Sequence, residues 1–266
     1  MDPTFIDGLW IAAQPIVNLS TGEVIGYESL IRGQPSSAWI SPAQLFAEAK
    51  RQGIEGPFDM HCRTLGLTWG QWHLSPEQRL FLTIHGDYAT LPINTDKLQI
   101  DPTRIAREIS PSHNVRENIE YWQQIQRWRE EGYHIVLDDG GVGYAGWEWL
   151  LTAQPHRAQI ARFLIAGIDH DQMRQSLITH SRELARDHGV VLGTEGLETA
   201  SELRCVQQLD SPFGQGFFVE QPAANPITQK TIGAIDYFGA GSHSFEPKLE
   251  PLRHDSDHSH GIAQPP

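Results

Sequence analysis

WIAAQPIVNLSTGEVIGYESLIRG, residues 10–33, is the stretch that decides the fold. Its apolar segments 10–17 and 24–32 are typical of strands, and the polar NLSTGE between them is short and turn-like. We therefore predict a hairpin of two strands at the start of the domain. Everything downstream has a different pattern, in which single strands alternate with helices.

This alternation is the sequence pattern of parallel α/β folds. Further strands are predicted at 80–84, 105–109, 134–139, 159–165 and 190–196. Helices are predicted from Ser41 onward and at 58–72, 115–129, 173–188 and 199–209. The apolar face of the fourth helix is expected to contain Met173, Leu177, Ser181, Leu184, Ala185 and His188. A hairpin followed by repeated strand–helix units favours a (β/α) barrel. No predicted strand is followed by a GxGxxG motif, which disfavours a fold that binds a dinucleotide cofactor.

Composition limits the function classes. The 266 residues are 39% hydrophobic and 20% charged, which is typical of a globular protein. A net charge of −13 disfavours DNA, RNA and anionic lipid as partners, and no apolar run is long enough for membrane insertion. The two cysteines are too few for a disulfide framework, so a cytoplasmic location is expected. We expect a barrel domain over 1–238 and a disordered tail over 239–266, whose His-rich run is interpreted as solvated.

Acidic residues follow or end several predicted strands, where barrel enzymes place their chemistry. They are Glu28, Glu108, Asp138, Asp139 and Glu195. A lone acid in such a place is usually a helix cap, but several acids at one mouth would repel one another without a counterion. A divalent cation such as Mg²⁺, Mn²⁺ or Ca²⁺ removes that repulsion, and Arg32 beside them suits a phosphate. The spacing therefore indicates a metal-and-phosphate pocket of the kind that hydrolyses phosphodiesters.

Five motifs in order resemble EAL domains, the cyclic di-GMP phosphodiesterases of bacterial signalling. The family signature ExLxR is present as Glu28-Ser29-Leu30-Ile31-Arg32. The segments LDDGGVGYAGW (137–147), QIARFLIAGID (159–169), LGTEGLET (192–199) and FGQGFFVEQP (213–222) resemble the later family motifs. The resemblance covers about residues 8–225 and implies a TIM-like (β/α)8 barrel whose first strand runs antiparallel.

The resemblance also implies roles for individual residues. It implies metal ligation of Mg²⁺ or Mn²⁺ by Glu28, Glu108, Asp138 and Asp139. It implies a catalytic set of Glu28, Asp138, Asp139 and Glu195. It implies cyclic di-GMP contacts from Gln14, Leu30, Arg32, Asp59 and Gln215, with Arg32 on phosphate and Asp59 on a guanine edge.

The chain departs from the family at positions that matter for catalysis. Thr83 replaces a metal-binding asparagine, and Gln159 replaces a lysine near the attacking water. Ala161 replaces an aspartate, and Pro111 replaces a glutamate thought to fix the loop after Asp139. Losing one preorganised charged group commonly costs roughly 3 kcal/mol of transition-state stabilisation. These replacements predict a degenerate, inactive phosphodiesterase.

Three functions remain open at this point. The first is a receptor that binds cyclic di-GMP without cleaving it, supported by the retained Gln14, Leu30 and Arg32. The second is a nucleotide-independent interaction module for an unknown protein partner, supported by the altered loop after Asp139 and the missing lysine. The third is a weak metal-dependent phosphodiesterase that gives pGpG. The resemblance also implies a homodimer, and Trp147 and Trp149 are equally compatible with a surface or a core position.

Overall fold

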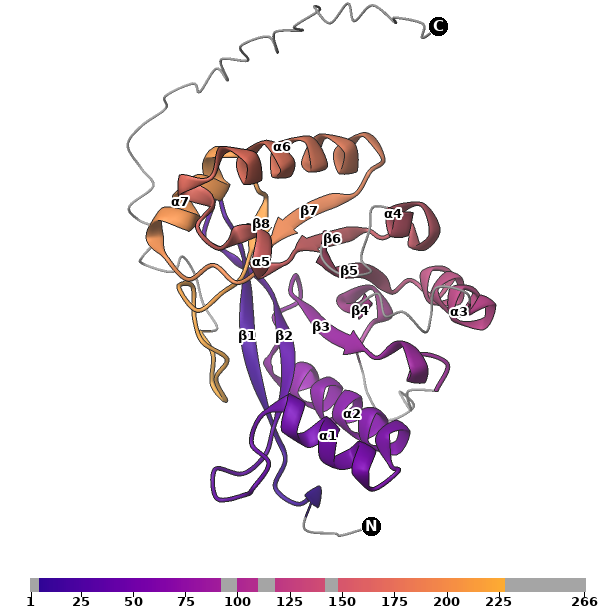
Figure 1. The fold of residues 1–266 in the computed structure, drawn as a ribbon. Helices are drawn as coiled ribbons and strands as arrows, with labels where there is room; N and C mark the ends of the chain where they lie inside the picture. Colours follow the sequence, from indigo (N-terminus) through magenta and orange to yellow (C-terminus); the bar gives the residue numbers. More distant parts are fainter. Residues whose placement is uncertain (1–4, 92–99, 110–117, 142–147, 228–266) are drawn as a thin grey trace, which may run out of the picture.

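A closed eight-stranded barrel forms the centre of the molecule (Figure 1), in a computed structural model that describes residues 5–91, 100–109, 118–141 and 148–227. The strands are β1 (Trp10–Asn18), β2 (Val24–Arg32), β3 (Arg79–Ile84), β4 (Ile105–Ile109), β5 (His134–Gly140), β6 (Arg157–Ile160), β7 (Val191–Thr194) and β8 (Phe213–Gly214). β1 pairs antiparallel with both β2 and β8, and all other neighbours pair in parallel. The predicted hairpin and TIM-like barrel with an antiparallel first strand are confirmed.

Helices surround the barrel (Figure 1). They are α1 (Pro42–Arg51), α2 (Glu55–His73), α3 (Ile119–Glu130), α4 (Glu148–Ala153), α5 (Arg162–Ile165), α6 (Gln172–Asp187) and α7 (Ala200–Gln208), with short 3-10 turns η2 (Gly86–Tyr88), η3 (Pro102–Arg104) and η5 (Ile168–His170). α1 begins where predicted because Ser41 and Gln44 form a reciprocal capping box. None of the described helices combines the length and apolar character that a bilayer crossing requires.

The strands bury apolar side chains on both faces. Their outward residues pack against the helices in the largest hydrophobic cluster. The inside of the barrel is filled by a smaller cluster, the apolar layer: Ile16, Phe81, Ala106, Val136 and Phe213. Because side chains alternate along a strand, the inward positions one step beyond this layer lie closer to the ends of the barrel. The inward-facing residues at these positions are polar at both ends of the barrel, so the candidate site lies at a barrel end.

Two predictions about the second half of the chain were wrong. The apolar run 159–165 was expected to be one strand, but β6 ends at Ile160 and a helical turn, α5, follows. An apolar run alone does not distinguish a buried strand from a buried helical turn. On α6, the buried residues are Ile178, Ser181 and Ala185, whereas the predicted core residues Met173, Leu177 and Leu184 are exposed. Ser181 and Ala185 belong to the predicted face and are buried, so spacing alone identified the buried face of α6 only in part.

Other predictions fall outside the described residues. They concern Pro111, the part of the altered loop over residues 142–147, which includes Trp147, the side chain of Trp149, and the tail from residue 239 with the boundary at 238. These remain predictions from the sequence.

Candidate functional site: an acidic barrel mouth beside a cavity

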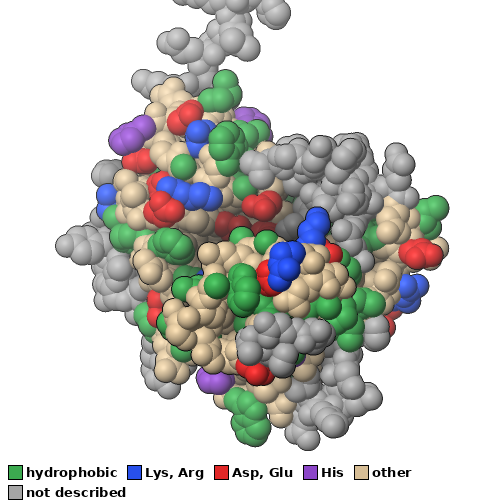
Figure 2. Space-filling model, turned by 60° about the horizontal axis from the view of Figure 1, so that its bottom comes forward, with side chains coloured by type: hydrophobic (Ala, Val, Ile, Leu, Met, Phe, Trp, Pro, Cys, Tyr) green, Lys and Arg blue, Asp and Glu red, His purple; other side chains and the backbone are tan. Residues whose placement is uncertain are grey.

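The predicted acids lie together at the carboxyl end of the barrel. Glu108 in β4 and Asp138 in β5 follow the apolar layer on the inward side of their strands. Glu28 in β2 is in register with Phe81 of that layer, and Glu195 comes directly after β7. Figure 2 looks toward this end of the molecule and shows acidic side chains in a recess near the centre of the face. The structure therefore brings together acids that are far apart in sequence, as strand alternation predicts.

Two neutral amides donate hydrogen bonds to these acids. Gln215 donates from Nε2 to Glu28 Oε2 at 2.8 Å. Gln159, which is 1% exposed, donates from Nε2 to Glu195 Oε1. Gln159, which the resemblance puts in place of a lysine, therefore contacts an acid of the site but brings no charge to it.

Burial and crowding make these carboxyls difficult to ionise. Burial, followed by the charge of Asp138, raises the pKa of Glu28 to about 7, although the Gln215 hydrogen bond and Arg32 oppose the rise. Burial also raises the pKa values of Glu108 and Glu195 well above their usual range, and neighbouring carboxylates add to the effect. The cluster is therefore under electrostatic stress that a cation would relieve.

The donor set fits a divalent cation. Asp138, Asp139 and Glu195 can each present an oxygen within 4.8 Å of the others. Both carboxylate oxygens of Glu108 and the amide oxygens of Gln159 and Gln215 are buried without a hydrogen-bond partner. Unpartnered buried oxygens are costly, and carboxylate and amide oxygens are the ligands that Mg²⁺, Mn²⁺ and Ca²⁺ prefer. Glu195 joins this group, whereas Glu28 and Glu108, both predicted ligands, lie outside the three-carboxylate cluster.

Backbone geometry contributes to the cluster at Asp139. This residue has φ of 53°, an uncommon left-handed conformation for a side chain other than glycine. Its backbone N–H donates to Asp138 Oδ1 at 2.9 Å. The turn thereby presents two consecutive carboxylates at the end of β5. Local strain of this kind is frequent where a chain holds functional groups together.

The raised pKa of Glu28 predicts a pH dependence of stability. A carboxyl whose pKa is higher in the folded state binds a proton more tightly there, so it favours folding at low pH. This contribution should be lost as the pH rises from about 4.5 to about 7. We expect the melting temperature in EDTA to fall across this window, and Mg²⁺ or Mn²⁺ to raise it more at pH 8 than at pH 5.5. Differential scanning fluorimetry measures both effects, and Glu28→Gln should flatten the pH dependence. Equal metal effects at the two pH values would contradict the assignment.

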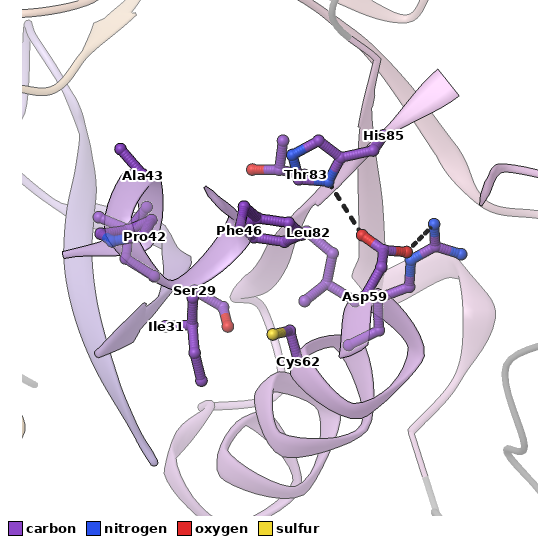
Figure 3. A pocket seen from close by; sticks show the side chains of 12 residues that line it. Ser29, Ile31, Pro42, Ala43, Phe46, Asp59, Cys62, Leu82, Thr83 and His85 are labelled. Atoms are coloured by element: carbon purple, nitrogen blue, oxygen red, sulfur yellow. Dashed lines mark hydrogen bonds and ion pairs between the residues drawn. The ribbon is translucent and has the colours of Figure 1, made fainter. Parts of the chain in front are cut away.

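A cavity of about 250 Å³ opens beside the acids (Figure 3). Its walls are Ser29, Leu30, Ile31, Pro42, Ala43, Phe46, Asp59, Cys62, Arg63, Leu82, Thr83 and His85. Thr83 connects the cavity to the acidic cluster, because it lies in register with Glu108 on the neighbouring strand. Apolar walls with a few polar groups at one end are typical of a small-molecule site.

The predicted guanine-reading residue Asp59 lies in the wall of this cavity. It is 1% exposed, forms an ion pair with Arg63, one turn along α2, and shares a hydrogen bond with His85, whose Nδ1 is 2.9 Å from Oδ1 (Figure 3). The His85 ring centroid lies 4.3 Å from that of Phe46. Sequence reasoning missed Arg63, His85 and Phe46. The i, i+4 spacing of Asp59 and Arg63 was the available signal for the first.

The other predicted ligand residues lie along the hairpin. Gln14 is opposite Glu28 in the β1–β2 register, and its Nε2 donates to the carbonyl of Glu220 at 3.0 Å. Leu30 lines the cavity. Arg32 is half-buried and donates to the carbonyl of Ile31 at 2.9 Å, but it forms no ion pair within 4.0 Å with a carboxylate among the described residues. Its remaining N–H groups are therefore available to an anionic ligand.

The replaced residues occupy the same mouth. Thr83 lies between the cavity and Glu108, and Gln159 contacts Glu195. Ala161 is 3% exposed at the start of α5 and offers no side-chain oxygen. The structure thus places two of the three described replacements in direct relation to the acids.

Known proteins place the chain in a family. The profile of the EAL domain matches residues 7–222, so the chain belongs to the EAL domain family. The probable cyclic di-GMP phosphodiesterase PdeB of Escherichia coli is 25% identical over 214 residues, which are 77% of this chain and 40% of PdeB. The cyclic di-GMP phosphodiesterase PA2567 of Pseudomonas aeruginosa is 26% identical over 230 residues, 81% of this chain and 38% of that protein. The chain thus spans less than half the length of either relative.

Solved structures share the fold. BlrP1 of Klebsiella pneumoniae, in complex with calcium and cyclic di-GMP, superposes with a TM-score of 0.75 at 21% identity, covering 86% of this chain and 60% of that one. A standalone EAL protein of Vibrio cholerae with cyclic di-GMP bound gives 0.70 at 23% identity, covering 82% and 94%. At such identities the likeness establishes the barrel, and the ligands belong to those proteins.

Proposed function

We propose that this EAL domain is a cyclic di-GMP receptor that binds the dinucleotide at the barrel mouth without hydrolysing it. The hydrogen bond from Gln159 to Glu195 carries the proposal, because a neutral amide stands where the family's chemistry uses a charged amine. Ala161 removes a further oxygen from the mouth. Both replacements reduce the electrostatic preorganisation that cleaving a phosphodiester requires.

Binding needs fewer of these groups than hydrolysis does. Arg32 presents unpaired N–H groups to a phosphate, and the cavity beside it has the apolar walls that suit a nucleobase. Neither feature involves Gln159 or Ala161. The geometry is therefore compatible with loss of catalysis and retention of ligand.

A metal has a place in this proposal as a counterion. Asp138, Asp139 and Glu195 would hold Mg²⁺ or Mn²⁺, with the unpartnered oxygens of Glu108 nearby. A bound cation would supply charge neutralisation between the acids and the ligand phosphates. Without it, the carboxylates weaken anion binding by repulsion, which Arg32 only partly offsets.

Calorimetric titration of cyclic di-GMP into the full chain, in EDTA and in Mg²⁺ or Mn²⁺, tests the proposal. We expect binding that is weaker in EDTA than in Mg²⁺ or Mn²⁺ but stays submicromolar, and no pGpG by chromatography over the course of the titration. Arg32→Ala should weaken binding roughly 10- to 100-fold, the value of one or two charge-assisted hydrogen bonds. Arg127→Ala, which removes an exposed arginine of α3 outside the mouth, is the matched control.

Two outcomes would overturn the receptor assignment. Absence of binding under every condition would favour the interaction module with a protein partner. Appearance of pGpG at a rate that scales with protein concentration would establish the weak phosphodiesterase.

A further inference from the structure

The amino end of the barrel carries a basic layer. Arg79, His134 and Arg157 are the first residues of β3, β5 and β6. In β3 and β5 the residue two positions later belongs to the apolar layer, so Arg79 and His134 lie on the inward side one step below it. Arg157 comes two residues before Gln159 in β6, so the two side chains point to the same, inward side of the strand. The apolar layer separates Arg79 and His134 from the acids at the opposite end, and Arg157 is in register with Val136 of that layer.

Contacts hold this basic layer in place but leave donors free. The Arg157 guanidinium lies 4.9 Å from the ring centroid of Phe213 in the apolar layer, and its Nη1 is buried without a hydrogen-bond partner. The rings of His134 and His156 are 4.7 Å apart, and Nδ1 of His134 is also buried without a partner. Arg79 donates from Nε to the carbonyl of Thr103 at 3.2 Å.

Among the described residues, no carboxylate forms an ion pair with this layer. Neither Arg79 nor Arg157 forms an ion pair with a carboxylate in the parts of the chain that the structure describes. Burial, followed by Arg79, lowers the pKa of Arg157 to about 10. Burial, followed by Arg79, His156 and Arg157, lowers the pKa of His134 to about 4. Cationic groups gathered this way destabilise the fold unless an anion joins them.

We propose that Arg79, His134, His156 and Arg157 form a binding site for a phosphate-type oxyanion at the amino end of the barrel. Two guanidinium groups offer several N–H donors to one tetrahedral anion, and the imidazoles add further donors once the anion favours their protonation. The apolar layer stands between this site and the mouth, so the inference does not depend on cyclic di-GMP binding. Free phosphate and the terminal phosphate of a mononucleotide share this chemistry.

Titration of inorganic phosphate into the full chain at constant ionic strength, by calorimetry and by thermal melting, tests the site. We expect phosphate to raise the melting temperature of the natural chain. Arg157→Gln should weaken phosphate binding at least about tenfold, the loss of one good charge-assisted contact. The same variant should melt higher than the natural chain without phosphate, because it removes a cation from the repulsive layer. Arg127→Gln, on α3, is the matched control and should respond like the natural chain.

A second variant keeps the test decisive if Arg157→Gln folds poorly. His134→Gln identifies the His134 signal in proton NMR spectra, and that signal should shift on adding phosphate to the natural chain. GMP that binds tighter than phosphate would indicate a nucleotide as the source of the anion, and equal binding would indicate free phosphate; both support the site. No phosphate response in the natural chain, or an equal response in folded Arg157→Gln, would overturn it.

Discussion

A Thr83→Asn, Gln159→Lys, Ala161→Asp variant is expected to produce pGpG from cyclic di-GMP at least about a hundredfold faster than the natural chain, in the presence of Mg²⁺ or Mn²⁺. A lysine at position 159 would place a positive charge against Glu195, where the natural amide only donates a hydrogen bond. That charge would lower the raised pKa of Glu195 and favour the ionised cluster. The substitutions Ala161→Asp and Thr83→Asn would add oxygen ligands at the same mouth.

Product formation is measured by chromatography under metal saturation, with the natural chain alongside. The matched control is Thr83→Asn, Gln159→Met, Ala161→Asp, because methionine is an unbranched side chain of similar length to lysine but has no charge. The effects of the three changes are not expected to add, since they act within one site. If the folded triple variant forms pGpG no faster than the natural chain, the altered loop after Asp139 limits catalysis instead.

Local sequence signals were sufficient for the architecture. The hairpin was predictable because a short polar turn separates two apolar strands, and its pairing places Gln14 opposite Glu28. The barrel was predictable because strand patterns and helix patterns alternate along the rest of the chain. The boundary of β6 was not predictable, because apolar residues continue from Ile160 into α5, where Ile165 is buried but Phe163 is 67% exposed.

Some residues of the site could be placed from the alternation of side chains along strands, whereas others depend on how distant elements pack. Glu28, Glu108 and Asp138 could be placed on one inward surface from their strands alone. The contact of Gln159 with Glu195 and the hydrogen bond between His85 and Asp59 could not, because each joins residues from different elements far apart in the chain. The family resemblance implied that Gln159 replaces a lysine, and this stays a prediction. Only the structure shows that Gln159 contacts the acid.

The packing of α3 on the barrel predicts the largest effect on stability. Trp128 of α3 is 2% exposed, and its ring centroid lies 4.3 Å from the guanidinium of Arg107 in β4. The same guanidinium lies 3.8 Å from the ring centroid of Tyr133. Trp128→Ala should lower the free energy of unfolding by about 3–5 kcal/mol, the usual cost of emptying a buried aromatic site. It would also leave the buried Arg107 charge with one aromatic neighbour fewer.

Urea denaturation followed by far-UV circular dichroism measures this change, and Trp128→Phe is the matched control because it keeps an aromatic face over Arg107. We expect the phenylalanine variant to lose less than half as much stability as the alanine variant. Because Arg107 precedes Glu108 in β4, its packing also fixes the strand that presents Glu108 at the mouth. A loss below about 1 kcal/mol for Trp128→Ala would mean that the site collapses around the deletion, and that the Arg107 contact contributes little. A full loss, with Trp128→Phe close to the natural chain, would instead show that an aromatic face over a buried cation helps to hold the acidic mouth in place.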